Sequence, residues 1–234
     1  MNPRRRRSAA FLVVGTLTAL ALFAGLTALG LWQVQRIHWK HALVAQIESR
    51  VGAAPVPAPK MANEGDAYRR VIAQGRFLHD RAVLVQASTA RGAGYWVMTP
   101  LAADGFTLLV NRGFVPPEQK ARYDRLQGVV RVTGLIRMSE PGGGFLRAND
   151  AAQSRWYSRD VAAIAQAQRL KGLIAPYFID AEGSGGYSFP IGGLTVLTFS
   201  DNHLGYAITW FVLAAMVAAA YIRVMIEERR ARRT

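Results

Sequence analysis

Two long uncharged runs, one near each end of the sequence, restrict the fold of this chain more than any other feature. Residues 9–31 (AAFLVVGTLTALALFAGLTALGL) contain no charged side chain. As a helix this run would be roughly 35 Å long, enough to cross a hydrocarbon core of about 30 Å. Residues 204–222 are also uncharged and would form a helix roughly 28 Å long. We therefore expect two transmembrane helices with a separate domain between them.

A cleaved signal peptide is an alternative interpretation of the first run. Arginines precede the run, and its end, TALG, resembles a small-residue cleavage site. The run is, however, longer than the usual hydrophobic region of about 7–15 residues. Together with the second run at the far end of the sequence, this length favours a retained membrane anchor.

Arginines cluster outside both apolar runs and predict the orientation of the chain. Four arginines lie in residues 1–8 and five lie in residues 223–234. Under the positive-inside rule both basic tails are cytoplasmic. The protein is then a two-pass protein of a bacterial inner membrane, with its main domain in the periplasm.

The net charge of +14 raises the question of a nucleic-acid partner. Half of this charge belongs to the two basic tails, where membrane topology already explains it. We therefore expect contact with the lipid bilayer and no nucleic-acid partner. The sequence also contains no cysteine, which excludes disulfides, thiol redox chemistry and a Cys-x-x-x-Cys copper site.

Three segments are predicted between the spans. Residues 32–50 repeat apolar side chains at helical spacing, which predicts a juxtamembrane helix with Trp32 and Trp39 at the level of the lipid headgroups. Residues 51–69 contain three prolines in PVPAP, which predicts a stiff extended linker rather than a packed element. Residues 70–203 form the main domain.

Short β-branched and aromatic runs predict that the main domain is mostly β. VIAQGRFL, RAVLVQAS, GYWVMTPL, FTLLVNRGFV and VVRVTGLIR are expected strands, with PYFIDA and LTVLTFS closing the sheet. LHDR and AADG are expected tight turns. Residues 159–170 predict one helix, with Asp160 as its N-cap and Gly172 as its stop. The expected fold class is membrane α+β, with two terminal transmembrane helices flanking a mostly antiparallel, barrel-like domain.

The common catalytic motifs are absent from the sequence. There is no Gly-x-Ser-x-Gly elbow, no phosphate loop and no His-Glu-x-x-His motif. The glycine clusters PGGGF and EGSGGY are expected turns. His38 and His41 lie three residues apart, but no third ligand is evident nearby, so we interpret them as interfacial polar residues.

Acidic residues near the expected helix give no better support for catalysis. Asp150 and Asp160 lie beside Arg155 and Arg159, and structural ion pairs are the expected arrangement. We therefore do not expect an enzyme.

His203 lies directly before the second apolar run, where an ionisable side chain is a functional candidate. Tyr206 follows after three residues and Trp210 after seven, on one face of the expected helix. An imidazole beside aromatic side chains is a plausible site for a flat hydrophobic macrocycle, since histidine is the commonest haem ligand. A histidine merely tolerated at the membrane surface is the open alternative.

Motifs spread over nearly the whole chain carry a family resemblance. They are LGLWQVQRIHWK, GRFLHDRAVLV, GYWVMTPL, VNRGFVP, GLIRMSEP, FLRANDAAQSRWYSRD, YFIDA, PIGG and NHLGYAITWF. In this order, they resemble the surfeit-locus-one family of cytochrome c oxidase assembly factors, and specifically a bacterial member.

The resemblance implies a role in placing haem a in the catalytic subunit of a haem-copper oxidase. It implies that His203 is the axial ligand of the haem iron and that Trp210 packs against the porphyrin, with Tyr206 as a further cofactor-binding residue. Gly113 and Tyr157 also match family motifs, and we favour roles in fold integrity for both. The implied partner is the oxidase catalytic subunit, with haem a synthase as a second candidate.

A cofactor-free scaffold is the alternative function. Such a protein would steady a partly built oxidase subunit, with small residues such as Ala215 and Ala219 packing against a partner helix. A carrier needs the imidazole of His203, whereas a scaffold tolerates glutamine there.

Overall fold

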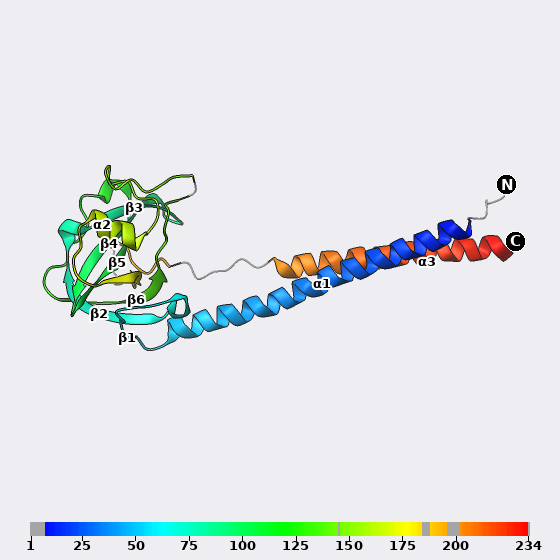
Figure 1. Cartoon of the computed structure of the whole chain (residues 1–234), viewed down its shortest axis with the longest axis horizontal. Coiled ribbons are helices and arrows are strands. Elements are labelled where there is room, and N and C mark those ends of the chain that lie inside the picture. Colours follow the sequence, from blue (N-terminus) through cyan, green and yellow to red (C-terminus); the bar gives the residue numbers. More distant parts are fainter. Residues whose placement is uncertain (1–7, 145, 184–187, 196–201, 234) are drawn as a thin grey trace. The chain divides into compact units, whose positions relative to one another are not determined.

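A computed structural model of the chain describes residues 8–144, 146–183, 188–195 and 202–233. The chain divides into two compact units. Residues Met1–Ala45 and Thr198–Thr234 form a helical unit, and residues Gln46–Leu197 form a β-rich unit (Figure 1). The predicted fold class is confirmed, with two long apolar terminal helices and a barrel between them in the sequence.

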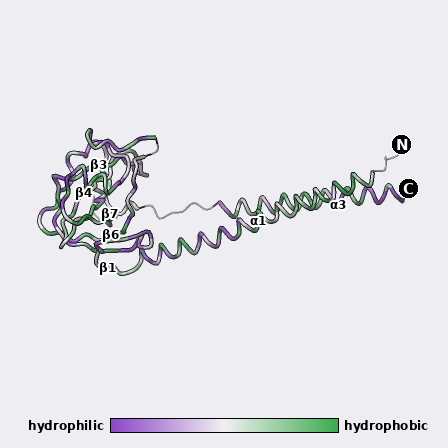
Figure 2. Tube along the Cα trace, viewed as in Figure 1, coloured by the Kyte–Doolittle hydropathy of each residue, from purple (hydrophilic) through white to green (hydrophobic). Residues whose placement is uncertain are grey.

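Two helices, α1 (Ala9–Gly52) and α3 (His203–Arg233), are long and apolar enough to cross a membrane. Each contains one of the predicted spans, and hydrophobic residues dominate both where they run side by side (Figure 2). The helix predicted for residues 32–50 is not a separate element, because α1 continues through it without a break. No proline or glycine pair interrupts this part of the sequence, so nothing there ends the helix.

The two helices pack against each other in antiparallel fashion. Thr16 Oγ1 lies 3.0 Å from the Tyr221 hydroxyl, and Gln33 Oε1 lies 2.8 Å from His203 Nδ1. The less exposed residues of α3 alternate in steps of four and three, which is the spacing of a coiled-coil seam. This seam consists of His203, Ala207, Trp210, Ala214, Val217, Tyr221, Val224 and Glu228.

In the described part of the chain, seven strands form one sheet, and five of them close into a barrel. The strands are β1 (Val56–Pro57), β2 (Arg70–Phe77), β3 (Val83–Thr89), β4 (Gly92–Ala103), β5 (Phe106–Val115), β6 (Val130–Met138) and β7 (Ile174–Ala181). The closed ring runs β2-β6-β7-β5-β4, and β4 pairs back onto β2. Closure leaves only the short β1 and the strand β3 outside the ring, which limits exposed edges.

The strand pairing is mixed rather than wholly antiparallel. β7 pairs with β6 in antiparallel fashion and with β5 in parallel fashion. β7 inserts between two strands that run in opposite directions, so it must be parallel to one of them. The sequence predicts the strands individually, but the position of β7 in the ring depends on contacts between distant segments.

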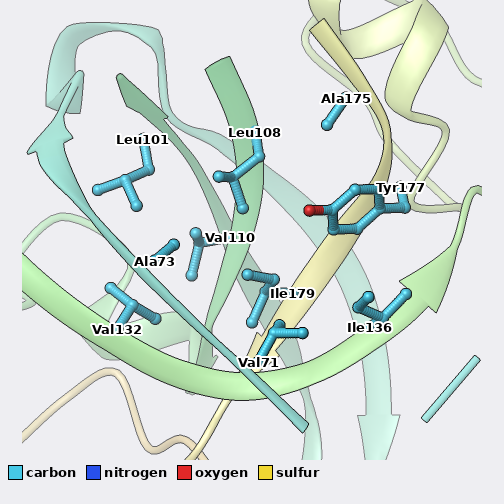
Figure 3. Packing of buried hydrophobic residues seen from close by; sticks show 10 residues of the cluster. All are labelled: Val71, Ala73, Leu101, Leu108, Val110, Val132, Ile136, Ala175, Tyr177 and Ile179. Carbon is cyan, nitrogen blue, oxygen red and sulfur yellow. The ribbon is translucent and has the colours of Figure 1, made fainter. Parts of the chain in front are cut away.

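The barrel interior is filled by one apolar cluster (Figure 3). Alternate residues point inward, as a period of two requires; on β7 these are Ala175, Tyr177 and Ile179. Phe178 points outward instead, into a second cluster with Trp156 and the short helix α2 (Val161–Ala167). The inner cluster consists of Val71, Ala73, Leu101, Leu108, Val110, Val132, Ile136, Ala175, Tyr177 and Ile179.

The proline-rich linker differs from its prediction, because part of it packs on the barrel. β1 pairs in parallel with β2, and Ala58 N donates a hydrogen bond to Ile72 O. Val56 and Ala58 pack against the inner cluster. The buried Tyr177 hydroxyl donates to Pro59 O. Proline has no N–H to offer a sheet and is tolerated at an edge, so the prolines permit this short strand.

The predicted turns and the N-cap of the helix are found in the structure. Asp104 and Gly105 form the two-residue connection between β4 and β5. LHDR contains a short 3-10 helix (His79–Arg81), and two more such helices, Glu64–Asp66 and Pro117–Gln119, occur among the described residues. The Asp160 side chain caps α2 by accepting from Ala163 N, although α2 ends at Ala167, before the predicted stop. Most of the predicted closing strand LTVLTFS lies outside the described residues.

Candidate functional site

His203 is the first residue of α3 and lies beside Gln33 of α1. Gln33 is 8 % exposed, which is unusual for an amide side chain in an apolar helix. With the Gln33 oxygen facing the ring, the imidazole carries its proton on Nδ1 and donates it to Oε1 over 2.8 Å. The pair therefore fixes both the ring orientation and the tautomer of His203.

This tautomer has the form that a metal-ligating histidine needs. A histidine that binds a metal through one ring nitrogen usually donates its other N–H to a carbonyl or carboxylate oxygen. Here the amide oxygen of Gln33 is that acceptor, and it contacts Nδ1 rather than Nε2. The sequence does not reveal that Gln33 takes part in this arrangement.

The structure separates the two aromatic residues predicted beside His203. Trp210 lies one heptad after His203 on the partly buried seam that faces α1. Tyr206 lies beside this face and is 57 % exposed. Both aromatic residues are within two turns of His203, so they can border one flat ligand from two sides.

The two histidines of α1, His38 and His41, form no evident metal site. Among the residues that the structure describes, no group of three or more His, Cys, Asp or Glu side chains is placed to hold a metal ion. Both histidine side chains are exposed, and their interpretation as interfacial residues stays a prediction.

A second polar site, which the sequence does not predict, lies around Asp180 at the end of β7. Its carboxylate is 6 % exposed and accepts hydrogen bonds from four side chains. Asn111 and Arg137 donate over 2.8 and 3.0 Å. Arg159 and Thr195 donate over 3.2 and 3.0 Å. These four donors satisfy the hydrogen-bonding capacity of the buried carboxylate.

Glu140 extends this network, because both of its carboxylate oxygens accept hydrogen bonds from the Arg159 guanidinium. Burial alone would raise the pKa of Glu140, but the hydrogen bonds and charge of Arg159 outweigh burial and lower it. Burial likewise opposes the charge of Arg159, yet its acidic partners raise its pKa. Two arginines and two carboxylates therefore balance one another, which is a structural arrangement.

Gly113 belongs to the same region and has a steric role. Its φ is +128°, and a Cβ there would lie 2.2 Å from Ile191 O. The Gly113 N–H donates to the side chain of Asn111, which in turn holds Asp180. Any side chain at position 113 would therefore push away the backbone at Ile191 and disturb the network.

Tyr157 and the acidic residues near α2 also have structural surroundings. Tyr157 N donates to Asn149 Oδ1, and the Arg147 guanidinium lies 5.5 Å from the centre of the Tyr157 ring. Asp150 forms the expected ion pair with Arg155 at 3.8 Å. Arg159 pairs instead with Glu140 and Asp180, and Asp160 caps α2 as predicted.

The motifs that carry the family resemblance meet around Asp180. NRGFVP supplies Asn111, GLIRMSEP supplies Arg137 and Glu140, WYSRD supplies Arg159, and YFIDA supplies Asp180. A model of the SURF1 family matches residues 20–215. This chain belongs to the SURF1 family.

Curated SURF1 relatives cover most of the chain. It is 37 % identical to Surfeit locus protein 1 of Rattus norvegicus over 228 residues, which is 86 % of this chain and 73 % of the relative. It is also 37 % identical to Surfeit locus protein 1 of Homo sapiens over 225 residues, 83 % of this chain and 71 % of the relative. The SURF1-like protein of Monosiga brevicollis is 34 % identical over 215 residues, 83 % of this chain and 81 % of that protein.

Membership of the SURF1 family places the chain among the cytochrome oxidase assembly factors, which are not enzymes. The matched region includes both Gln33 and His203 as well as the Asp180 network. The Asp180 network and the Gln33–His203 pair have different roles. The network holds the barrel together, whereas the Gln33–His203 pair presents a polar ring at the start of an apolar helix.

Proposed function

We propose that this protein binds haem a at His203 and assists its insertion into the catalytic subunit of a haem-copper cytochrome oxidase. The observation that carries the proposal is the hydrogen bond between Gln33 and His203. A structural histidine at the edge of an apolar helix needs no buried amide to fix its tautomer. A histidine that ligates a metal usually has such a partner for its other ring nitrogen.

The residues around His203 suit the chemistry of haem a. When bound, haem a supplies an iron that accepts an imidazole ligand and a long apolar tail that favours lipid. His203 would coordinate through Nε2, while Gln33 holds the ring. Trp210 and the exposed Tyr206 offer aromatic surface for a porphyrin. The apolar body of α3, directly after His203, suits the tail.

A single histidine also suits a carrier that must release its cargo. α3 contains only one histidine, so α3 itself does not offer a second imidazole. One neutral ligand binds iron less tightly than two and favours transfer to a stronger acceptor site. The oxidase catalytic subunit is the proposed acceptor, and haem a synthase is the proposed donor.

The proposed location is a bacterial inner membrane, with both termini in the cytoplasm and the barrel in the periplasm. The arginines that follow the apolar part of α3 and precede that of α1 support this orientation. His203 would then lie at the periplasmic membrane surface, together with Trp32 and Trp39 of α1, which are both exposed.

A cofactor-free scaffold is the second candidate, and one observation favours it. Ala215 and Ala219 are exposed on α3, outside the seam that faces α1. Small residues on an unused helix face allow close approach of another transmembrane helix. An oxidase subunit could bind there without any cofactor on the assembly factor.

Complementation of a deletion strain separates the two functions. The strain would receive the wild-type chain, His203→Ala, His203→Gln or Ala215→Leu, and the haem a content of the catalytic subunit would be measured. A carrier predicts that both His203 variants leave the subunit present but deficient in haem a. A scaffold predicts normal haem a with both His203 variants and a reduced amount of subunit with Ala215→Leu.

A further inference from the structure

Arg112 on β5 is a buried arginine that is not fully satisfied. Its side chain is 8 % exposed. Its Nη1 is buried and has no hydrogen-bond partner in the described part of the chain. The guanidinium lies over the ring of Phe77, 4.9 Å from the ring centre, but a ring face does not replace a hydrogen-bond acceptor. Buried polar groups are nearly always paired, so this exception calls for an explanation.

Arg112 also forms no ion pair with a carboxylate of the described residues. Burial lowers the pKa of Arg112, and the charges of Asp124 and Tyr123 oppose this only in part. Arginine nevertheless keeps its proton in proteins, so the buried group is a cation. Among the described residues, Asp124 does not form an ion pair with it. Glu182 is occupied by Arg70, with contacts of 2.6 and 2.9 Å.

A pocket opens beside this guanidinium. Its volume is about 350 Å³, and Arg112 is part of its lining. The lining includes the apolar side chains of Phe77, Leu126, Val132, Phe189 and Pro190. The backbone of Leu126 is held in place by His79, because His79 Nε2 donates to Leu126 O over 2.8 Å. Arg131, Asp124 and Glu182 line it as well, together with the hydroxyl residues Thr133 and Ser188. The pocket therefore combines the underused cation of Arg112 with walls that are partly apolar and partly polar.

We propose that this Arg112 pocket binds a carboxylate carried on an apolar group. A guanidinium presents parallel N–H donors that match the two oxygens of a carboxylate. The apolar walls suit a hydrocarbon or aromatic body attached to that carboxylate. A phosphate dianion suits the pocket less well, because the carboxylates of Asp124 and Glu182 offset the two lining arginines, Arg112 and Arg131, and leave little net positive charge for a second negative charge.

Two sources offer this chemistry. One is a propionate of a porphyrin, and this source alone rests on the proposed function. The other is a free aromatic or aliphatic acid. Either ligand would bind through its own carboxylate group, so Arg112 would control the binding of both.

The test uses the full chain in detergent with two kinds of probe. 3-Phenylpropionate represents a free acid. Metal-free protoporphyrin IX represents a porphyrin that cannot ligate His203, and its dimethyl ester lacks free carboxylates. Binding would be measured by calorimetry for the acid and by porphyrin fluorescence for the macrocycles. The variants are Arg112→Met, Arg112→Lys and the control Arg122→Met, which removes an exposed arginine from the following loop.

The proposal predicts that at least one carboxylate probe binds the wild type. Arg112→Met should weaken this binding at least tenfold, Arg112→Lys should weaken it less, and Arg122→Met should leave it unchanged. Circular dichroism would establish that each variant is folded. Binding of the porphyrin but not of its ester identifies a propionate, whereas binding of the acid alone identifies a free acid.

Two results would overturn the proposal. One is the absence of binding of every carboxylate probe to the wild type. The other is equal binding to the wild type and a folded Arg112→Met. Neither result depends on iron coordination, so the His203→Ala variant should bind the metal-free probes as the wild type does. Failure of the haem a function and failure of the Arg112 pocket are therefore distinguishable.

Discussion

Gln33 and His203 lie 170 residues apart in the sequence, yet their side chains meet at 2.8 Å where α1 and α3 pack together. A buried amide and an imidazole cost free energy in an apolar setting unless they satisfy each other. Their pairing therefore links the antiparallel arrangement of the helices directly to the proposed haem ligand.

Removal of the Gln33 oxygen should weaken haem binding. Gln33→Leu is expected to lower the affinity for haem a by about 10–100-fold, because the partner of a metal ligand sets its orientation and basicity. Gln33→Glu should stay within a few-fold of the wild type, since a carboxylate also accepts the Nδ1 proton. The measurement is an absorption titration of the full chain in detergent. Gln35→Leu, on the exposed face of α1, is the matched control, and an equal loss there would contradict the role of Gln33.

The close approach of α1 and α3 should depend on Gly30. A Cβ at Gly30 would lie 2.6 Å from the Phe211 ring, whereas a Cβ at Gly25 would meet nothing within 4 Å. Gly30→Val should therefore separate the helices, and Gly25→Val should not. The chain has no cysteine, so Thr16→Cys and Tyr221→Cys can be joined by a short thiol cross-linker. We expect a several-fold lower yield with Gly30→Val, and an unchanged yield would show that the helices do not need this contact.

Gly113→Ala should destabilise the barrel through two separable effects. The positive φ strains any L side chain by about 1–2 kcal/mol, and the contact with Ile191 O adds an overpacking cost of about 1–3 kcal/mol. Gly128 also has a positive φ, of +79°, but a Cβ there meets nothing within 4 Å. Gly128→Ala should therefore show only the strain. Urea unfolding followed by tryptophan emission would compare the two, and equal losses would refute the steric role of Gly113.

Glu140 should make the stability of the barrel depend on acid pH. Its pKa in the folded state is lowered from the ordinary value of 4.5, so the unfolded state binds the proton more tightly. The stabilisation is present above pH 4.5 and is lost as the pH falls through the folded-state pKa. The free energy of unfolding of Glu140→Gln should thus fall less steeply with acid than that of the wild type. Glu118→Gln, at an exposed site, should follow the wild-type curve in the same urea series.

The sequence predicts the elements of this fold better than their arrangement. Uncharged length alone identifies α1 and α3, and alternating β-branched residues identify β2 to β7. The parallel pairing of β5 with β7 has no local signal, because it depends on which distant strands meet. The packing of β1 was missed for a related reason. Prolines at positions 55, 57 and 59 indicate extended backbone, and whether extended backbone pairs depends on its neighbour.

The candidate sites show the same limit. His203 is recognisable because a histidine at the start of an apolar run is rare. Gln33 is not recognisable from the sequence, because a glutamine after a membrane span is common and its partner is visible only in the structure. The residues around Asp180 are isolated polar or charged side chains in separate strands and loops. Only the closed barrel brings Asn111, Arg137 and Arg159 together.

The most direct test of the haem-carrier account is the absorption spectrum of the protein purified in detergent after co-expression with the enzymes of haem a synthesis. The account predicts a reduced haem a band in the wild type that is absent from His203→Ala and retained in His38→Ala and His41→Ala. A band of equal intensity in His203→Ala would contradict it, because the cofactor would then be held without the imidazole that Gln33 orients.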